Sequence, residues 1–314
     1  MSSPKLTDFK VLVFDTYGTL ADWETGIYNA MKPLLSKYPA SASWSRDDAL
    51  KAFTAVELDL QARQPDLLYA DLLAKSHEVL EERLRAASGK EVKSTTLEGD
   101  PATAPASSSD ASTSAGTPSI ADHHVAFGQS VKDWPIFPDS PAALQVLSKY
   151  YKLAVLSNVD RTSYGHTLAK LSEGESNSYD PKIYTAPPAS PGEFWFPRHN
   201  QPDSKSPFTL IVTAQDVKSY KPAHHGFNVA LDLIQKHPDL LNDPEGKELK
   251  AKEKVLWVAQ SVTHDIVPAK ELGLETVWIN RAGASMGGVE QGSTIKPTWV
   301  FSTLGEMAEA VEKE

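Results

Sequence analysis

The chain has 314 residues, no cysteine and a formal net charge of −10 at pH 7. The lack of cysteine excludes disulfides and thiolate chemistry, and an acidic chain without a block of basic residues disfavours nucleic-acid and anionic-membrane partners. No apolar run approaches the length of a transmembrane helix, and the first residues lack the charged and apolar regions of a signal peptide, so we expect a cytoplasmic protein.

Short apolar runs rich in Val, Ile and Leu predict strands that are buried on both faces, as in a parallel sheet covered by helices. Helical patterns lie between them, and this alternation predicts a Rossmann-like, doubly wound α/β core. The predicted strands are 11–14, 153–156, 210–212, 255–258 and 276–279, and the helices between them are 140–150, 225–236 and 267–272.

Residues 23–87 differ from this pattern, because they contain amphipathic helices (47–63 and 68–87) and no convincing strand. We therefore predict a helical cap, residues 22–127, inserted into an α/β core formed by residues 1–21 and 128–314. Within the cap, residues 88–119 are mostly Ser, Thr, Ala, Pro and Gly, a composition that predicts a disordered loop.

A second irregular insert, residues 172–206, lies in the predicted core. It contains Tyr184, Phe194, Trp195 and Phe196. The large apolar surfaces of these side chains would be exposed to water if the insert did not pack on the core. We expect part of this insert to dock on the core.

Four short polar motifs follow predicted strands or lie just beyond them, at the edge where open α/β sheets bind ligands. In the first of them, Gly18 allows a sharp turn that would leave Asp15 exposed at the sheet edge. The motifs are DTYGTL beginning at Asp15, Ser157 with Asn158, Lys221 within SYKP, and QSVTHD from Gln260 to Asp265.

These residue types suit nucleophilic chemistry. A carboxylate such as Asp15 is a modest nucleophile that becomes useful when a cation holds it ionised, and Lys221 supplies that cation. Asp265 could orient Lys221 or a hydrolytic water. The candidate hydrogen-bond donors to a substrate carboxylate or phosphate are Thr19, Ser157 and Asn158.

The order of these motifs resembles the haloacid dehalogenase superfamily: an Asp after the first strand, then Ser or Thr, then Lys, then an acidic motif. Residues 15–20 (DTYGTL), the helical cap and the ending TVWINR at 276–281 look like its L-2-haloacid dehalogenase branch. The resemblance covers nearly the whole chain outside the two inserts. It implies a hydrolase that cleaves the carbon–halogen bond of short (S)-2-haloalkanoic acids through an Asp15 ester, giving a 2-hydroxy acid and halide, and it allows a homodimer.

Two departures from phosphatases of this superfamily predict that neither a metal nor another cofactor is needed. Tyr17 stands where phosphatases carry a second Asp, and Gln260 stands where they carry an acidic magnesium ligand. Two alternatives stay open: a small-molecule phosphatase, and a catalytically inactive member that binds a small acid or a protein partner.

The resemblance also implies further substrate contacts. Arg63 is the closest match to the cap arginine that lies near the leaving halide, while Tyr17 and Ser261 complete the candidate substrate-binding residues. Two roles stay open for His264: capping a helix, or activating water. The adjacent pairs His123–His124 and His224–His225 are predicted to be surface residues and not metal ligands, because neighbouring side chains of a helix point apart.

Overall fold

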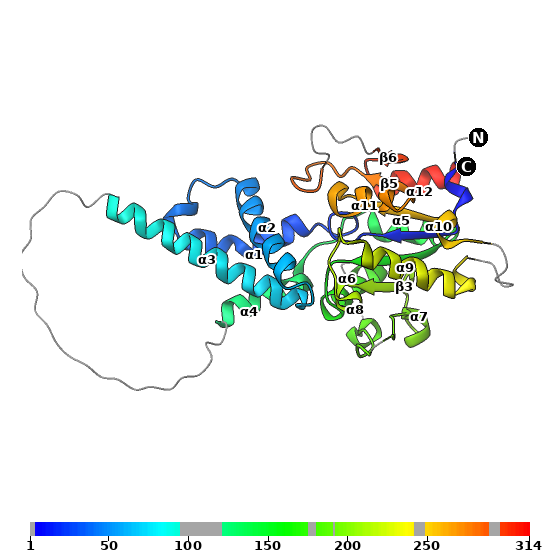
Figure 1. The fold of residues 1–314 in the computed structure, drawn as a ribbon, viewed down its shortest axis with the longest axis horizontal. Coiled ribbons are helices and arrows are strands. Elements are labelled where there is room, and N and C mark those ends of the chain that lie inside the picture. Colours follow the sequence, from blue (N-terminus) through cyan, green and yellow to red (C-terminus); the bar gives the residue numbers. More distant parts are fainter. Residues whose placement is uncertain (1–3, 95–120, 175–179, 191, 242–248, 289–295) are drawn as a thin grey trace, which may run out of the picture.

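The computed structural model describes residues 4–94, 121–174, 180–190, 192–241, 249–288 and 296–314. Figure 1 shows two lobes, a sheet with helices on both faces and, beside it, a group of helices. None of the helices in this part of the chain combines the length and the apolar character needed to cross a bilayer.

The larger lobe is built on a six-stranded sheet in the order β3-β2-β1-β4-β5-β6, and every pairing is parallel. This arrangement confirms the predicted Rossmann-like α/β core. The strands are β1 (Val11–Phe14), β2 (Lys152–Ser157), β3 (Phe208–Thr213), β4 (Val255–Ala259), β5 (Glu275–Ile279) and β6 (Trp299–Phe301).

Both faces of the sheet are covered, which is why its strands read as continuous apolar runs. In β1, Leu12 and Phe14 belong to one hydrophobic cluster, and Val11 and Val13 belong to the other. The first cluster includes α5 (Ser140–Leu147), α6 (Arg161–Glu173) and α12 (Leu304–Lys313), and the second includes α9 (His224–Lys236) and α11 (Val267–Glu271).

The sequence pattern did not predict β6. This strand has three residues at the edge of the sheet, and its burial is only partial. A short edge strand lacks the continuous apolar run that marks the buried strands, so periodicity alone does not reveal it.

The smaller lobe, called the cap, consists of α1 (Trp23–Lys37), α2 (Arg46–Arg63), α3 (Tyr69–Ser94) and α4 (Asp122–Gly128). Ser45 begins α2 with a reciprocal capping box to Asp48. Asp160 of the core accepts the Ala70 N–H of α3 at 3.0 Å and also caps α6 through the Ser163 N–H at 2.8 Å. One carboxylate therefore joins the cap to the core.

The predicted end of the second cap helix needs correction. Helix α3 continues to Ser94, so residues 88–94 of the predicted loop are helical. The sequence Lys-Glu-Val-Lys at 90–93 contains strong helix formers and no proline, which explains the extension. The remainder of the predicted loop, 95–119, lies outside the described residues.

The aromatic residues of the insert 172–206 dock as predicted. Tyr184 and Trp195 are almost completely buried, and the Ile211 N–H of β3 donates to the Trp195 carbonyl at 2.8 Å. Because β3 lies at the edge of the sheet, the insert covers part of an edge that would otherwise be exposed. The described part of the insert contains the short helices η4 (Pro181–Tyr184) and α7 (Pro197–Asn200).

Candidate active site

The site lies where the strand order reverses, beyond the carboxyl ends of β1 and β4. The chain runs from β1 outward to β3 and then returns to place β4 on the other side of β1. Asp15 follows β1 directly, and Asp265 lies in the helical turn η6 (Val262–Ile266) after β4. Lys221 comes from the segment between α8 (Ala214–Val217) and α9.

Lys221 joins the two carboxylates. Its Nζ lies 2.8 Å from Asp15 Oδ1, 2.8 Å from Asp265 Oδ1 and 3.1 Å from the Leu156 carbonyl oxygen. All three ionisable side chains are buried. Burial alone would lower the pKa of Lys221, but the two adjacent carboxylates outweigh it and raise that pKa. Burial raises the pKa of Asp265, and Lys221 opposes the shift.

The turn after β1 fixes the second oxygen of Asp15. Thr19 donates its hydroxyl to Asp15 Oδ2 at 2.7 Å and accepts the Gln260 backbone N–H at 2.8 Å. Gly18 has a φ of +99°, and a Cβ there would lie 2.8 Å from Gln260 Oε1. The predicted need for glycine at this turn is confirmed. Thr19 holds the carboxylate of Asp15 and does not line the cavity.

Asn158 and Ser157 have different positions although they are adjacent. Asn158 accepts the Lys221 backbone N–H at 2.7 Å and donates to the Lys221 carbonyl at 3.1 Å, so its amide positions the lysine. Asn158 also lines the cavity, whereas Ser157 is fully buried outside its lining. Asn158 therefore lies at the cavity wall, while a substrate contact by Ser157 stays a prediction.

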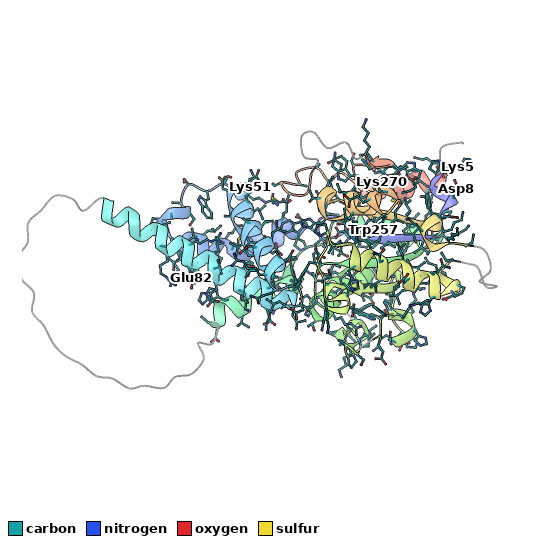
Figure 2. All side chains as sticks on the ribbon, viewed as in Figure 1. Lys5, Asp8, Lys51, Glu82, Trp257 and Lys270 are labelled. Atoms are coloured by element: carbon teal, nitrogen blue, oxygen red, sulfur yellow. The ribbon has the colours of Figure 1, made fainter. Side chains whose placement is uncertain are left out.

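A cavity of about 590 Å³ separates these core residues from the cap. Figure 2 labels Lys51 on the cap side and Trp257 in the sheet, whose indole N–H donates to Asp265 Oδ1 at 3.1 Å. Helix α2 and the start of α3 form the roof. The principal lining residues are Asp15, Tyr17, Asn158, Lys221, Ser261, His264 and Asp265 from the core, and Lys51, Thr54, Glu57, Leu58, Gln61 and Tyr69 from the cap.

The cavity does not include Arg63. Its side chain is 71% exposed and forms an ion pair with Asp59 at 2.9 Å. The cavity-facing positions of α2 are 51, 54, 57, 58 and 61, which share one helical face. Arg63 lies on another side of the helix, two residues beyond the last of them, so the structure does not bring it to the place expected for a halide contact.

No pattern in the sequence predicts that the polar residues of the roof line the cavity. Glu57 is buried, and burial raises its pKa to about 7, while a hydrogen bond with Tyr69 opposes the shift. Lys51 supplies a cation to the same wall. Only the position of α2 across the cavity from the core identifies these side chains as part of the lining.

Tyr17 contributes its ring and not a free hydroxyl. Its hydroxyl shares a hydrogen bond with Thr167 Oγ1 at 2.8 Å, and its ring packs edge-on against Trp134. Burial raises the pKa of Tyr17 well above its ordinary value. The side chain is therefore neutral and serves as an apolar part of the cavity wall.

Ser261 and His264 line the cavity together. The Ser261 hydroxyl accepts the His264 backbone N–H at 3.2 Å and lies 3.1 Å from His264 Nδ1. Burial and the nearby Lys221 charge lower the pKa of His264, so its ring is neutral near pH 7. The backbone of His264 completes a helix cap while its side chain faces the cavity.

The prediction that His123 and His124 are both surface residues with side chains pointing apart is wrong. His224 is partly exposed and forms an ion pair with Glu271, but His124 is buried and its ring centroid lies 3.9 Å from that of His123. The rings of His123 and His124 both contact Glu81 of α3, because α4 packs against that helix.

No protein-family model and no curated protein matches the sequence. Several solved structures resemble the fold. An L-2-haloacid dehalogenase from Xanthobacter autotrophicus is 15% identical with a TM-score of 0.55, and the alignment covers 97% of this chain and 98% of that one. The same enzyme with chloropropionic acid covalently bound is 14% identical, again with a TM-score of 0.55 and coverages of 97% and 98%.

A third similar structure is a HAD hydrolase, YfnB from Bacillus subtilis, solved with bound magnesium. It is 13% identical with a TM-score of 0.54, and the alignment covers 97% of this chain and 99% of that one. These likenesses confirm that the chain has the fold of haloacid dehalogenase superfamily hydrolases, a parallel α/β core with a cap.

Proposed function

We propose that this chain is a hydrolase that cleaves the carbon–halogen bond of short (S)-2-haloalkanoic acids through an ester on Asp15. The observation that carries the proposal is the position of Asp15 in the cavity lining, with one carboxylate oxygen bound by Lys221 and the other by Thr19. This arrangement holds the carboxylate beside a cation and fixes its orientation, which suits a weak nucleophile.

In the first step, a carboxylate oxygen of Asp15 attacks C2 of the substrate. The new carbon–oxygen bond forms as the carbon–halogen bond breaks, and the halide leaves with the bonding electrons. Because halide is a stable anion, the leaving group needs no proton. This suits a site in which Tyr17, with its hydroxyl bonded to Thr167, stands where a phosphatase carries an acid.

In the second step, water attacks the carbonyl carbon of the Asp15 ester. One proton of the water ends on the 2-hydroxyl of the product, and the other passes through a base to solvent. Asp265 suits the role of base, because its Oδ2 makes no hydrogen bond with any residue that the structure describes and burial raises its pKa. Breaking the ester regenerates the Asp15 carboxylate.

The cavity also supports an anionic small molecule as substrate. Lys51 on the roof supplies the cation for the substrate carboxylate, because Lys221 on the floor already contacts Asp15 and Asp265. A volume of about 590 Å³ exceeds the needs of the smallest haloacids, so we expect chains longer than that of 2-chloropropionate to be accepted. The covalently bound chloropropionic acid of the similar Xanthobacter structure supports the same chemistry.

A single turnover in oxygen-18 water tests the ester. With enzyme in excess over 2-chloropropionate, the label should enter the peptide that contains Asp15 and be absent from the lactate formed. Asp15→Asn should abolish turnover while the near-isosteric amide keeps the fold, and Asp133→Asn, at an exposed position, should retain full turnover. Label found directly in the product would refute the ester mechanism.

A phosphatase is the second candidate, and the magnesium-bound similar structure favours it. The distinguishing assay compares halide release with phosphate release, each after chelation and after addition of magnesium. We expect halide release that survives EDTA, because Gln260, whose side-chain amide donates to the Met286 carbonyl, replaces an anionic ligand. Phosphate release that requires magnesium would establish the phosphatase instead. Binding of 2-chloropropionate without either reaction would indicate an inactive member.

A further inference from the structure

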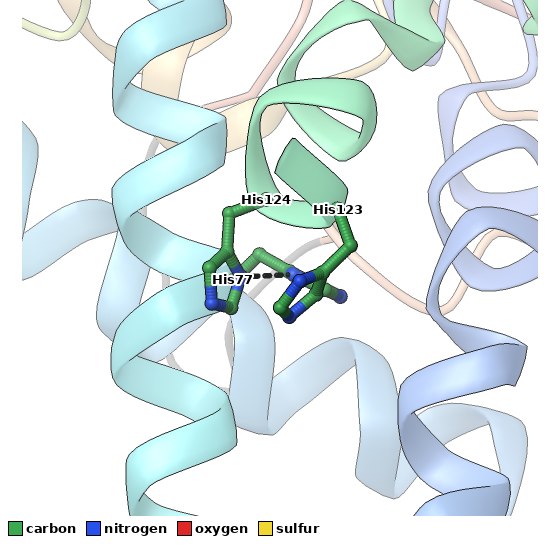
Figure 3. A group of neighbouring side chains, drawn as sticks. All are labelled: His77, His123 and His124. Carbon is green, nitrogen blue, oxygen red and sulfur yellow. Dashed lines mark hydrogen bonds between the residues drawn. The ribbon is translucent and has the colours of Figure 1, made fainter. Parts of the chain in front are cut away.

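Three histidine side chains meet in the cap, between α3 and α4. His77 comes from α3, and His123 and His124 come from the first turn of α4 (Figure 3). One ring nitrogen of each lies within 4.8 Å of the corresponding nitrogens of the other two. None of the three lines the cavity that contains Asp15, so this cluster has no part in the proposed dehalogenation.

Two of these rings are held between the helices, and the third reaches solvent. His77 and His124 are 4% and 5% exposed, while the side chain of His123 is 54% exposed. The Nδ1 atoms of His77 and His124 lie 2.7 Å apart, and the ring of His77 stacks on Phe127 with centroids 4.3 Å apart. The cluster therefore has a fixed inner side and an open outer side.

Glu81, one turn after His77 on α3, contacts both histidines of α4. Its Oε2 lies 2.8 Å from His123 Nε2 and 3.4 Å from His124 Nε2. Lys37 Nζ and the Tyr38 hydroxyl both bind Glu81 Oε1 at 2.6 Å, which anchors the carboxylate. A carboxylate on one ring nitrogen fixes the tautomer and turns the other nitrogen toward a ligand, the arrangement found around metal-bound histidines.

We propose that His77, His123 and His124 bind a divalent transition-metal ion, with Zn²⁺ as the best match. Imidazole nitrogens suit zinc and its neighbours, whereas magnesium and calcium prefer oxygen ligands. Zn–N bonds of about 2.0–2.1 Å in tetrahedral geometry separate ligand nitrogens by about 3.4 Å. The present separations begin at 2.7 Å and reach no more than 4.8 Å, so small ring rotations produce the site.

Water would complete the coordination, because the His123 side chain is partly exposed and Glu81 is already held by Lys37, Tyr38 and His123. The ion would replace the direct contact between His77 and His124 and would link α4 to α3 on the two sides of residues 95–120. Metal binding would therefore stabilise the cap without entering the reaction.

Competitive titration of the full chain tests the proposal. Protein stripped with a chelator is titrated with Zn²⁺ against a chromophoric chelator, and we expect one equivalent to bind. His123→Ala should weaken binding by at least about tenfold, since it removes one of three ligands. That side chain is largely exposed, so the variant should fold normally. The control His199→Ala, at an exposed position in α7, should keep the parent affinity.

Two further measurements separate a built site from casual histidine binding. Substitution with Co²⁺ should give the intense visible bands of tetrahedral coordination in the parent and lose them in His123→Ala. Added Zn²⁺ should raise the melting temperature of the parent but not of this variant. Equal zinc affinity in parent and variant, or no binding by the parent, would overturn the proposal and leave a metal-free, hydrogen-bonded histidine pair. Because none of these readouts is turnover, the result does not depend on the dehalogenase proposal.

Discussion

The floor of the candidate active-site cavity, formed by core residues such as Asp15, Lys221 and Asp265, and its roof, formed by α2 and the start of α3, accommodate buried charge in different ways. On the floor, Lys221 lies 2.8 Å from both Asp15 and Asp265, so each buried carboxylate has a cation beside it. On the roof, Glu57 is buried, and no described residue forms an ion pair with it. Burial without a cation raises the pKa of Glu57 to about 7.

This difference suggests that the floor carries out the reaction and that the roof affects substrate binding. On the floor, both carboxylates contact the Lys221 ammonium group, which holds them in place. The unpaired carboxyl of the roof changes its charge near neutral pH, and it does so beside the space where an anionic substrate would bind. We therefore expect changes to the floor to abolish the reaction, and changes to the roof to alter stability or substrate affinity.

Removing the shared cation should have the largest effect. Lys221→Met leaves two buried carboxylates without a partner and should lower the free energy of unfolding by about 3–5 kcal/mol, together with loss of turnover. Urea denaturation with halide release measures both. Lys236→Met, at an exposed position of α9, is the matched control. A variant as stable as the parent would show that the floor does not depend on charge balance.

Glu57→Gln should increase stability above neutral pH. In the folded protein Glu57 stays protonated up to about pH 7, whereas the unfolded chain ionises near 4.5. The free energy of unfolding of the parent therefore falls as pH rises through this window. The variant should match the parent near pH 4 and exceed it by up to about 3 kcal/mol near pH 8. Denaturation at both pH values measures the difference, and a gap that is independent of pH would contradict an unpaired buried carboxyl.

Weakening the start of α2 should affect the roof and spare the floor. Ser45→Ala removes the capping box with Asp48 and should cost about 1 kcal/mol in unfolding free energy, while kcat stays near the parent value. Ser45→Thr keeps a capping hydroxyl and should behave like the parent. A large loss of kcat in the alanine variant would mean that the roof takes part in the chemical step.

The smallest effect is expected from an exposed residue of the roof. Lys51→Met removes an exposed cation from the roof and should raise KM for 2-chloropropionate by about fivefold without changing kcat. Arg63→Met is the control, since that side chain lies outside the cavity and pairs with Asp59. If Arg63→Met raises KM and Lys51→Met does not, the cap must adopt a different arrangement when substrate binds.

The floor could be predicted from the sequence because it lies on a parallel sheet. Apolar runs identify the strands, parallel strands end at a common edge, and polar residues just beyond those ends must therefore come together. Asp15, Lys221 and Asp265 follow this rule and lie in contact. Ser157, the last residue of β2, is fully buried and does not line the cavity.

The roof could not be predicted in this way. Amphipathic helices show that a helix has an apolar face, but their polar residues carry no sign of which neighbour will cover them. Arg63 and Glu57 both lie on α2, and only the rotation of that helix over the sheet places Glu57 in the cavity and Arg63 in solvent. The sequence resemblance indicated a cap, but it could not supply this rotation.

By itself the sequence determined the parallel core, the inserted cap and the carboxylate at the end of the first strand, because each depends on patterns within a short segment. Tertiary structure alone decided which helix faces enclose the cavity and how α4 packs against α3. The histidines of the cap illustrate the reason. His123 and His124 are neighbours in the chain, but their meeting with His77 depends on the contact between two helices far apart in sequence.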